Sequence, residues 1–247
     1  MSQCCVSGFK WNGEPEGKVT KLGKNDVYVT GTNNEVAILM VHDVYGWTLP
    51  NARLLADHYA KEADATVFLP DFFGGEIVTP KMMEDPKKRE AFDLMAFIGR
   101  NNKEKRFPEI SEFAKALKTE HGFKKLGAIG FCYGGWAVFQ LGAKGKNLVD
   151  CISTAHPSLL KKEEIDAIGV PVQIMAPEHD QQFTPELKAH ANSVIPSLNV
   201  EYDYQYFPGL THGFSIRCDP SDPKQKNGME RAKNAAVAWF AQILHLH

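Results

Sequence analysis

Residues 130–134 read GFCYG, a cysteine with a glycine two residues away on each side. This G-x-C-x-G pattern is that of a nucleophile elbow with cysteine in place of serine. In such an elbow the reactive side chain sits on a strained strand-to-helix turn, and small flanking residues let strand and helix approach each other. Gly130 and Gly134 meet that need, and the N-terminus of the following helix would favour a Cys132 thiolate. The pattern taken alone slightly favours a structural cysteine in a glycine-rich turn.

A thiol nucleophile needs a base, and the base needs an acid that orients it. After an elbow of this kind, the chain order is nucleophile, acid, histidine. Asp180 follows the next-but-one predicted strand after Cys132, and His212 follows the strand after that. We therefore predict a triad of these three residues, with the N–H of Tyr133 as an oxyanion donor. Glu178 is the alternative acid, and Asp180 is preferred because it lies deeper in its loop.

Aromatic side chains and a further histidine follow other predicted strands. The aromatic residues suit an apolar pocket for a flat or hydrophobic acyl group, and they are Tyr45, Trp47, Phe72 and Phe73. For Phe72 and Phe73 an ordinary core position is an equal alternative. His156 is a candidate donor to a substrate oxygen, and fixing its own loop is the alternative role.

Alternating strands and helices must bring these residues to one edge of a sheet. Short apolar runs predict strands, with the loops that follow them, at 26–31, 35–46, 64–75, 125–133, 148–158, 170–180 and 200–209. Longer amphipathic stretches predict helices at 49–63, 87–100, 105–121, 134–144, 161–168, from Thr184 onward, and at 223–245. The alternation predicts an α/β fold with a mainly parallel sheet and helices on both faces. Ligands of such sheets bind beyond the carboxyl ends of the strands, where the candidate residues lie.

Composition narrows the class of protein. The 247 residues are 43% hydrophobic and 23% charged, with a formal net charge of −2, ordinary values for a soluble globular protein. No repeat or linker divides the chain, so we expect a single domain over residues 1–247. Charges spread along the chain argue against nucleic-acid binding. The apolar runs are shorter than a membrane span.

The cysteines favour a reducing compartment. Their number, five, is odd, and no C-x-x-C spacing occurs, which argues against a disulfide framework or a zinc site. No signal peptide is recognisable at the N-terminus. We expect a cytoplasmic monomer or homodimer that uses no metal and no organic cofactor.

With the predicted triad assembled, the chain resembles the dienelactone hydrolase family, and its opening residues resemble eukaryotic, especially fungal, members. The matching segments lie between about residues 40 and 215 and read HDVYGW, LPDFFGG, GFCYGGW, PEHD and THGF. The resemblance implies an α/β-hydrolase fold and a triad of Cys132, His212 and Asp180. It also implies hydrolysis of a small lactone or activated enol or aryl ester through a thioester.

The same resemblance implies roles for residues around the triad. Asp43 occupies the place of a family carboxylate that contacts the thiol and helps to ionise it, although the best-studied bacterial type has the longer glutamate. Val44 would supply the second oxyanion N–H. Arg217 corresponds to an arginine that holds the substrate carboxylate in the bacterial type. A second such arginine has no counterpart in the loop 71–76, so a carboxylated dienelactone is in doubt as the substrate.

Two other functions fit these residues. A broader carboxylesterase or thioesterase of secondary metabolism would accept larger acyl chains. A non-catalytic protein could use the hydrolase fold to bind a ligand, although an intact triad argues against it. For either enzyme the expected partner is a small-molecule ester or lactone.

Overall fold

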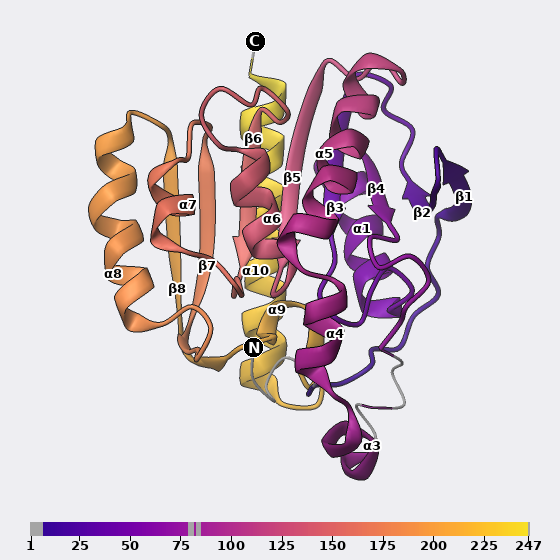
Figure 1. Cartoon of the computed structure of the whole chain (residues 1–247), viewed down its shortest axis with the longest axis vertical. Coiled ribbons are helices and arrows are strands. Elements are labelled where there is room, and N and C mark those ends of the chain that lie inside the picture. Colours follow the sequence, from indigo (N-terminus) through magenta and orange to yellow (C-terminus); the bar gives the residue numbers. More distant parts are fainter. Residues whose placement is uncertain (1–6, 79–81, 83–84, 247) are drawn as a thin grey trace.

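An eight-stranded sheet forms the centre of the molecule (Figure 1). The computed structural model describes residues 7–78, 82 and 85–246, so that Cys4 and Cys5 lie outside the described residues. The strand order is β1-β2-β4-β3-β5-β6-β7-β8. The strands are β1 (Lys18–Leu22), β2 (Asn25–Thr30), β3 (Val36–Val41), β4 (Thr66–Pro70), β5 (Lys125–Phe131), β6 (Cys151–Ala155), β7 (Val172–His179) and β8 (Tyr202–Thr211). All pairs among β3 to β8 are parallel, whereas β2 pairs antiparallel with β1 and β4.

Helices cover both faces of this sheet. Their bounds are α1 (Pro50–Glu62), α3 (Pro86–Ala91), α4 (Leu94–Arg100), α5 (Lys103–Thr119), α6 (Gly134–Leu141), α7 (Lys162–Asp166), α8 (Pro185–Val194), the 3-10 helix η2 (Ile195–Leu198), α9 (Phe214–Arg217) and α10 (Pro223–His245). Helices α1 and α10 pack on one face, and α5 and α6 pack on the other (Figure 1). The predicted α/β architecture with a mainly parallel, doubly covered sheet is therefore confirmed.

The sequence explains most of these elements locally. Every residue of β3 is buried, as expected for an apolar strand covered on both faces. Helix α8 begins where the Thr184 hydroxyl accepts the Leu187 N–H at 3.3 Å, with Pro185 in the first turn. Helix α10 begins in the same manner at Asp222 and Pro223. A capping side chain followed by proline marks both starts.

The structure differs from the prediction at several places, one of which is the short helix α9, which has no predicted counterpart. The predicted helix 87–100 is two helices, because the Asp93 side chain accepts the Ala96 N–H at 2.8 Å and starts a new helix. Strand β1 was not predicted at all. It is a short edge strand with mostly exposed, polar residues, so it lacks an apolar pattern.

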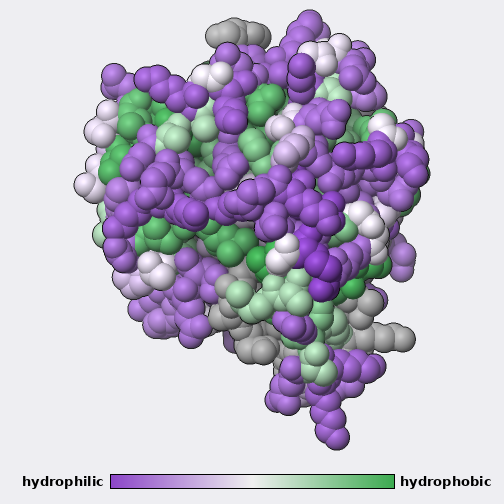
Figure 2. All heavy atoms as spheres, viewed as in Figure 1, coloured by the Kyte–Doolittle hydropathy of each residue, from purple (hydrophilic) through white to green (hydrophobic). Residues whose placement is uncertain are grey.

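The surface is mainly polar. On the face viewed in Figure 2, hydrophilic residues dominate and hydrophobic residues form scattered groups. Among the large hydrophobic residues that the structure describes, Met95 on α4 is the most exposed, at 67%. Within the described residues, every helix is too short or too polar to cross a membrane.

The packing is very close where β5 turns into α6. A Cβ atom added to Gly134 would lie 2.1 Å from the Val41 carbonyl oxygen, and one on Gly130 would lie 2.2 Å from the Gly134 oxygen. A Cβ on Gly135 would lie 2.3 Å from the Cβ of Pro157. These separations are far inside van der Waals contact, so only glycine fits at all three positions. The turn is thereby clamped between β3, α6 and the loop after β6.

We expect Gly134→Ala to lower the free energy of unfolding by about 1–3 kcal/mol, because its methyl group would overlap the main chain of β3. Gly99→Ala is the matched control, because an added Cβ there meets nothing within 4 Å. In a helix, replacing glycine with alanine raises the free energy of unfolding by up to about 1 kcal/mol. Urea unfolding of both variants measures the difference. Equal stability of the two variants would contradict the conclusion that close packing at Gly134 fixes the turn.

Candidate active site

The three predicted triad residues follow three parallel strands directly. Cys132 comes after β5, Asp180 after β7 and His212 after β8. Cys132 has a φ of 49°, in the left-handed region that residues other than glycine rarely adopt. Its carbonyl oxygen accepts the N–H of Gly135 at 3.0 Å and that of Ser158 at 2.7 Å. The strained turn of a nucleophile elbow is therefore present, and main-chain hydrogen bonds hold it.

The imidazole of His212 is oriented by Asp180. Its Nδ1 lies 3.0 Å and 2.9 Å from the two carboxylate oxygens, and the two side chains are 1% and 0% exposed. Asp180 Oδ1 also accepts the N–H groups of Gln182 at 2.7 Å and Phe183 at 3.2 Å. A carboxylate at Nδ1 fixes the tautomer that has its proton there, which leaves Nε2 as a base.

Glu178, the alternative acid, points elsewhere. Its carboxylate accepts the Gly209 N–H at 2.6 Å, and this bond is the main cause that lowers the pKa of the Glu178 side chain. The geometry therefore places Asp180, and not Glu178, on His212.

A serine that sequence reasoning missed stands between thiol and imidazole. Ser158 Oγ lies 3.3 Å from Cys132 Sγ and 3.5 Å from His212 Nε2. It is completely buried. The feature of the sequence that points to Ser158 is its position shortly after β6, two residues after His156.

The two predicted oxyanion donors are Val44 and Tyr133, which are both buried. In the part of the chain that the structure describes, neither main-chain N–H donates to a protein acceptor. Tyr133 is the N-cap residue of α6, and its hydroxyl donates to the Asn101 carbonyl at 2.6 Å. Its ring packs edge-on against Phe73, with the ring centroids 5.0 Å apart. The side chain thus anchors the residue, while its amide is left without a protein acceptor.

Asp43 and Arg217 pair with each other. The Arg217 Nη1 donates to Asp43 Oδ2, and both side chains are fully buried. The other oxygen of Asp43 accepts the Tyr45 N–H at 2.9 Å. Arg217 also donates from Nε to the Ser7 carbonyl at 3.0 Å and lies over the Tyr45 ring at 5.6 Å. The residue predicted to tune the thiol and the residue predicted to bind a substrate carboxylate are therefore ion-paired to each other.

His156 lies against the imidazole of His212. The two ring centroids are 4.8 Å apart and the rings meet edge to face. His156 is fully buried with a φ of 42°, and its Nε2 lies 2.8 Å from Ser215 Oγ. Within the described residues its Nδ1 has no hydrogen-bond partner. Burial, and then the neighbouring His212 and Arg217, lower the pKa of His156 well below the ordinary value of 6.5, so the ring is neutral.

Three of the predicted pocket aromatics lie in packing contacts. Phe73 packs on Tyr133, Phe72 is fully buried, and both belong to the hydrophobic core. Trp47 is half-buried, with the Arg53 guanidinium 5.0 Å from its ring centroid. None of these three lines the cavity beside His212, so their contact with substrate stays a prediction.

A cavity of about 660 Å³ opens beside His212. Its lining contains two cationic side chains and no carboxylate among the described residues, and comprises Ser7, Gly8, Phe9, Lys10, Thr211, His212, Gly213, Phe214, Arg217, Cys218 and Gln225. The N-terminal wall is held by Asn51, whose Nδ2 donates to the carbonyls of Phe9 and Ile216 at 2.8 Å each. Sequence reasoning missed this wall because nothing in residues 7–10 signals a contact so distant along the chain.

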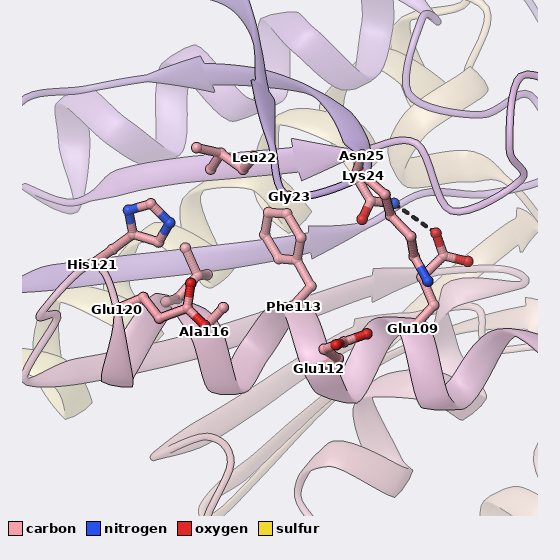
Figure 3. A pocket seen from close by; sticks show the side chains of 11 residues that line it. Leu22, Gly23, Lys24, Asn25, Glu109, Glu112, Phe113, Ala116, Glu120 and His121 are labelled. Atoms are coloured by element: carbon pink, nitrogen blue, oxygen red, sulfur yellow. Dashed lines mark hydrogen bonds between the residues drawn. The ribbon is translucent and has the colours of Figure 1, made fainter.

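A second hollow, of about 280 Å³, lies between the β1–β2 turn and α5 (Figure 3). There the Asn25 amide donates to Glu109 at 2.7 Å, while Phe113 points into the same space. No predicted site residue lines this hollow. Nor do the described residues include a cluster of three His, Cys, Asp or Glu that could hold a metal ion.

We expect Arg217→Met to destabilise the fold by about 3–5 kcal/mol, because it leaves the buried Asp43 carboxylate without its cation. Adding Asp43→Asn to that variant should restore part of the loss, since the uncompensated charge is then gone. A double-mutant cycle in urea measures both. A double variant no more stable than the single one would contradict the pairing argument.

The neutral His156 should make stability fall in acid. In the unfolded chain this histidine binds a proton near its ordinary pKa of 6.5, whereas the folded ring does so only at much lower pH. Below about pH 6.5 the unfolded state thus holds the extra proton, and each pH unit costs up to about 1.4 kcal/mol from this residue. His156→Gln should flatten the slope of unfolding free energy against pH by up to that amount.

The control for this measurement is His179→Gln, since the His179 side chain is 65% exposed and folding changes its surroundings little. An identical slope for the wild type and His156→Gln would show that the ring takes up its proton at the same pH in the folded and unfolded chain, which would contradict this prediction.

Comparison with known proteins places this geometry in a family. The model of the dienelactone hydrolase family matches residues 26–244. The hydrolase pyvD of Aspergillus violaceofuscus is 31% identical over 248 residues, which cover 98% of this chain and 97% of that protein. The carboxymethylenebutenolidase homolog of Homo sapiens is 29% identical over 220 residues, with 84% and 82% covered.

The fold agrees as well. The crystal structure of dienelactone hydrolase from Anabaena variabilis superimposes with a TM-score of 0.64 at 15% identity, over 94% of this chain and 99% of that one. This likeness confirms the α/β-hydrolase fold that the sequence implied. The family match covers far more than half of the chain, and the chain therefore belongs to the dienelactone hydrolase family.

Proposed function

We propose that the protein hydrolyses a small lactone or an activated enol or aryl ester through a covalent thioester on Cys132. The observation that supports this most is the buried Asp180–His212 pair at the edge of the sheet where the strained turn presents Cys132. A buried, oriented imidazole beside a thiol at a helix N-terminus is the arrangement that nucleophilic catalysis needs.

The first step is removal of the thiol proton. His212 accepts it at Nε2, and Asp180 stabilises the imidazolium by accepting the Nδ1–H. Helix α6 begins directly after Tyr133. The partial positive charge at its N-terminus favours the negative charge on the Cys132 sulfur.

The thiolate then attacks the ester carbonyl carbon, and the carbonyl oxygen becomes an oxyanion. The N–H groups of Val44 and Tyr133 are the proposed donors to this oxygen, because neither has a protein acceptor among the described residues. His212 gives its proton to the leaving alkoxide or enolate as the carbon–oxygen bond breaks. It then deprotonates a water that cleaves the thioester, and the carboxylic acid and free thiol result.

The proposed choice of substrate follows from the chemistry of the thiolate and from the cavity beside His212. A thiolate is itself a good leaving group, so an alkoxide of high pKa competes poorly against it for expulsion from the tetrahedral intermediate. Enolates and phenolates leave more readily, so enol lactones and aryl esters should react faster than plain alkyl esters. Lys10 in the lining of the cavity beside His212 suits a substrate that bears negative charge, whereas the charge of Arg217 is already paired with Asp43.

The residues around the triad have supporting roles in this proposal. Asp43 keeps the thiol-tuning role that the family resemblance implies, with its carboxylate held by Arg217 and the Tyr45 N–H. Arg217 faces the cavity and orients a polar group of the substrate. His156 presents its unpartnered Nδ1 to a substrate oxygen. Tyr45 holds the Arg217 guanidinium in place. Contact of Trp47, Phe72 and Phe73 with the acyl group stays a part of this proposal that their packing in the core does not support.

The test compares aryl acetates, enol lactones and alkyl acetates with wild type and Cys132→Ala. We expect kcat/KM of the variant to fall at least about a thousandfold on the activated substrates, because the nucleophile is gone. Cys151→Ala is the matched control and should keep wild-type turnover. Burial raises the pKa of that thiol, and it lies within β6.

Equal turnover by Cys132→Ala would overturn the proposed nucleophile. Tight binding of these esters without any turnover, in the wild type itself, would instead favour a ligand-binding protein.

A further inference from the structure

The hydroxyl of Ser158 touches both reacting partners of the proposed triad. Its Oγ is 3.3 Å from Cys132 Sγ and 3.5 Å from His212 Nε2. Among the described residues, Ser158 Oγ is the hydrogen-bond partner of the thiol. We propose that Ser158 is a further catalytic residue that relays the thiol proton to His212, an inference that rests on the function proposed above.

Main-chain contacts hold the Ser158 hydroxyl next to Cys132. The Ser158 N–H donates to the Cys132 carbonyl at 2.7 Å, so the two residues are joined by main chain as well as by side chain. Pro157 abuts α6 so closely that Gly135 has no room for a side chain. The loop after β6 is thus clamped against the elbow, and the Ser158 side chain is buried where it meets the sulfur.

The relay balances in protons and charge. In the resting state the thiol S–H donates to Ser158 Oγ, and the serine O–H donates to His212 Nε2. As the sulfur loses its proton to Oγ, the serine passes its own proton to Nε2. One S–H bond and one O–H bond break, and one O–H bond and one N–H bond form. The products are a thiolate, a neutral serine and an imidazolium that donates to Asp180 from Nδ1.

The serine also stabilises the thiolate once it forms. After the relay its new O–H points at the sulfur and donates to the thiolate, which stabilises the charged form. The serine itself never bears charge, because an alkoxide is too basic to survive there, so both transfers are concerted. A purely structural hydroxyl would support the loop without changing the ionisation of Cys132.

The experiment measures the rate of iodoacetamide alkylation of Cys132 against pH, together with kcat and KM on an aryl acetate, for Ser158→Ala. We expect the apparent pKa of alkylation to rise and kcat to fall about ten- to a hundredfold with KM little changed. Ser158→Thr keeps a hydroxyl at the same position and should restore most of both. Ser153→Ala is the matched control, because its buried hydroxyl in β6 bonds to Gln173 at 2.7 Å, outside the triad.

Other ionisable groups near the thiol are the same in all of these proteins. Those of the described residues are His212 after β8, Asp180 after β7, His156 after β6, and the Asp43–Arg217 pair from β3 and α9. A shift confined to Ser158→Ala is therefore due to the lost hydroxyl.

The outcomes separate the relay from the triad. An alkylation profile and kcat for Ser158→Ala that match Ser153→Ala, while Cys132→Ala is inactive, would overturn the relay alone. Turnover that survives in Cys132→Ala would overturn the proposed function itself. If Ser158→Ala does not fold, as judged by circular dichroism, Ser158→Gly replaces it, and a wild-type profile in that variant counts against the relay in the same way.

Discussion

The lack of free space where β5 meets α6 is the constraint on which the rest of the site depends. Gly134 presses on the main chain of Val41, and Gly135 presses on Pro157. These contacts fix the helix, the neighbouring strand and the next loop with respect to the turn. Cys132 keeps its unfavourable φ of 49° because the surroundings leave it no alternative. The strain is thus a consequence of packing, and it aims one side chain at the edge of the sheet.

Two buried carboxylates of the site are each held by a partner side chain. Asp180 meets His212 with almost no solvent exposure, and Asp43 meets Arg217 in the same way. His156 is the exception that avoids charge altogether, since burial keeps its ring neutral. Each carboxylate also accepts main-chain N–H groups, which a desolvated anion requires. The result is a compact set of oriented groups whose ionisation states depend on one another.

Reasoning from sequence reached the main layout because it depends on local signals. Alternating apolar strands and amphipathic helices gave the parallel sheet, and chain order placed Cys132 and Asp180 beyond its strands. Contacts between loops could not be predicted from the sequence. The ion pair of Asp43 with Arg217 joins residues 174 apart in sequence, and Ser158 touches the thiol only because the loop after β6 folds against the elbow. No propensity or spacing in a single sequence encodes such distances.

The central claim is that the acyl group of the substrate is carried on Cys132. Its most direct test is mass spectrometry of the protein quenched in acid during turnover of an aryl pivalate, whose hindered thioester hydrolyses slowly. The account predicts a mass increase of one pivaloyl group on the peptide that contains Cys132, which decays as substrate is exhausted. Hydrolysis with the acyl group on a different side chain would contradict it.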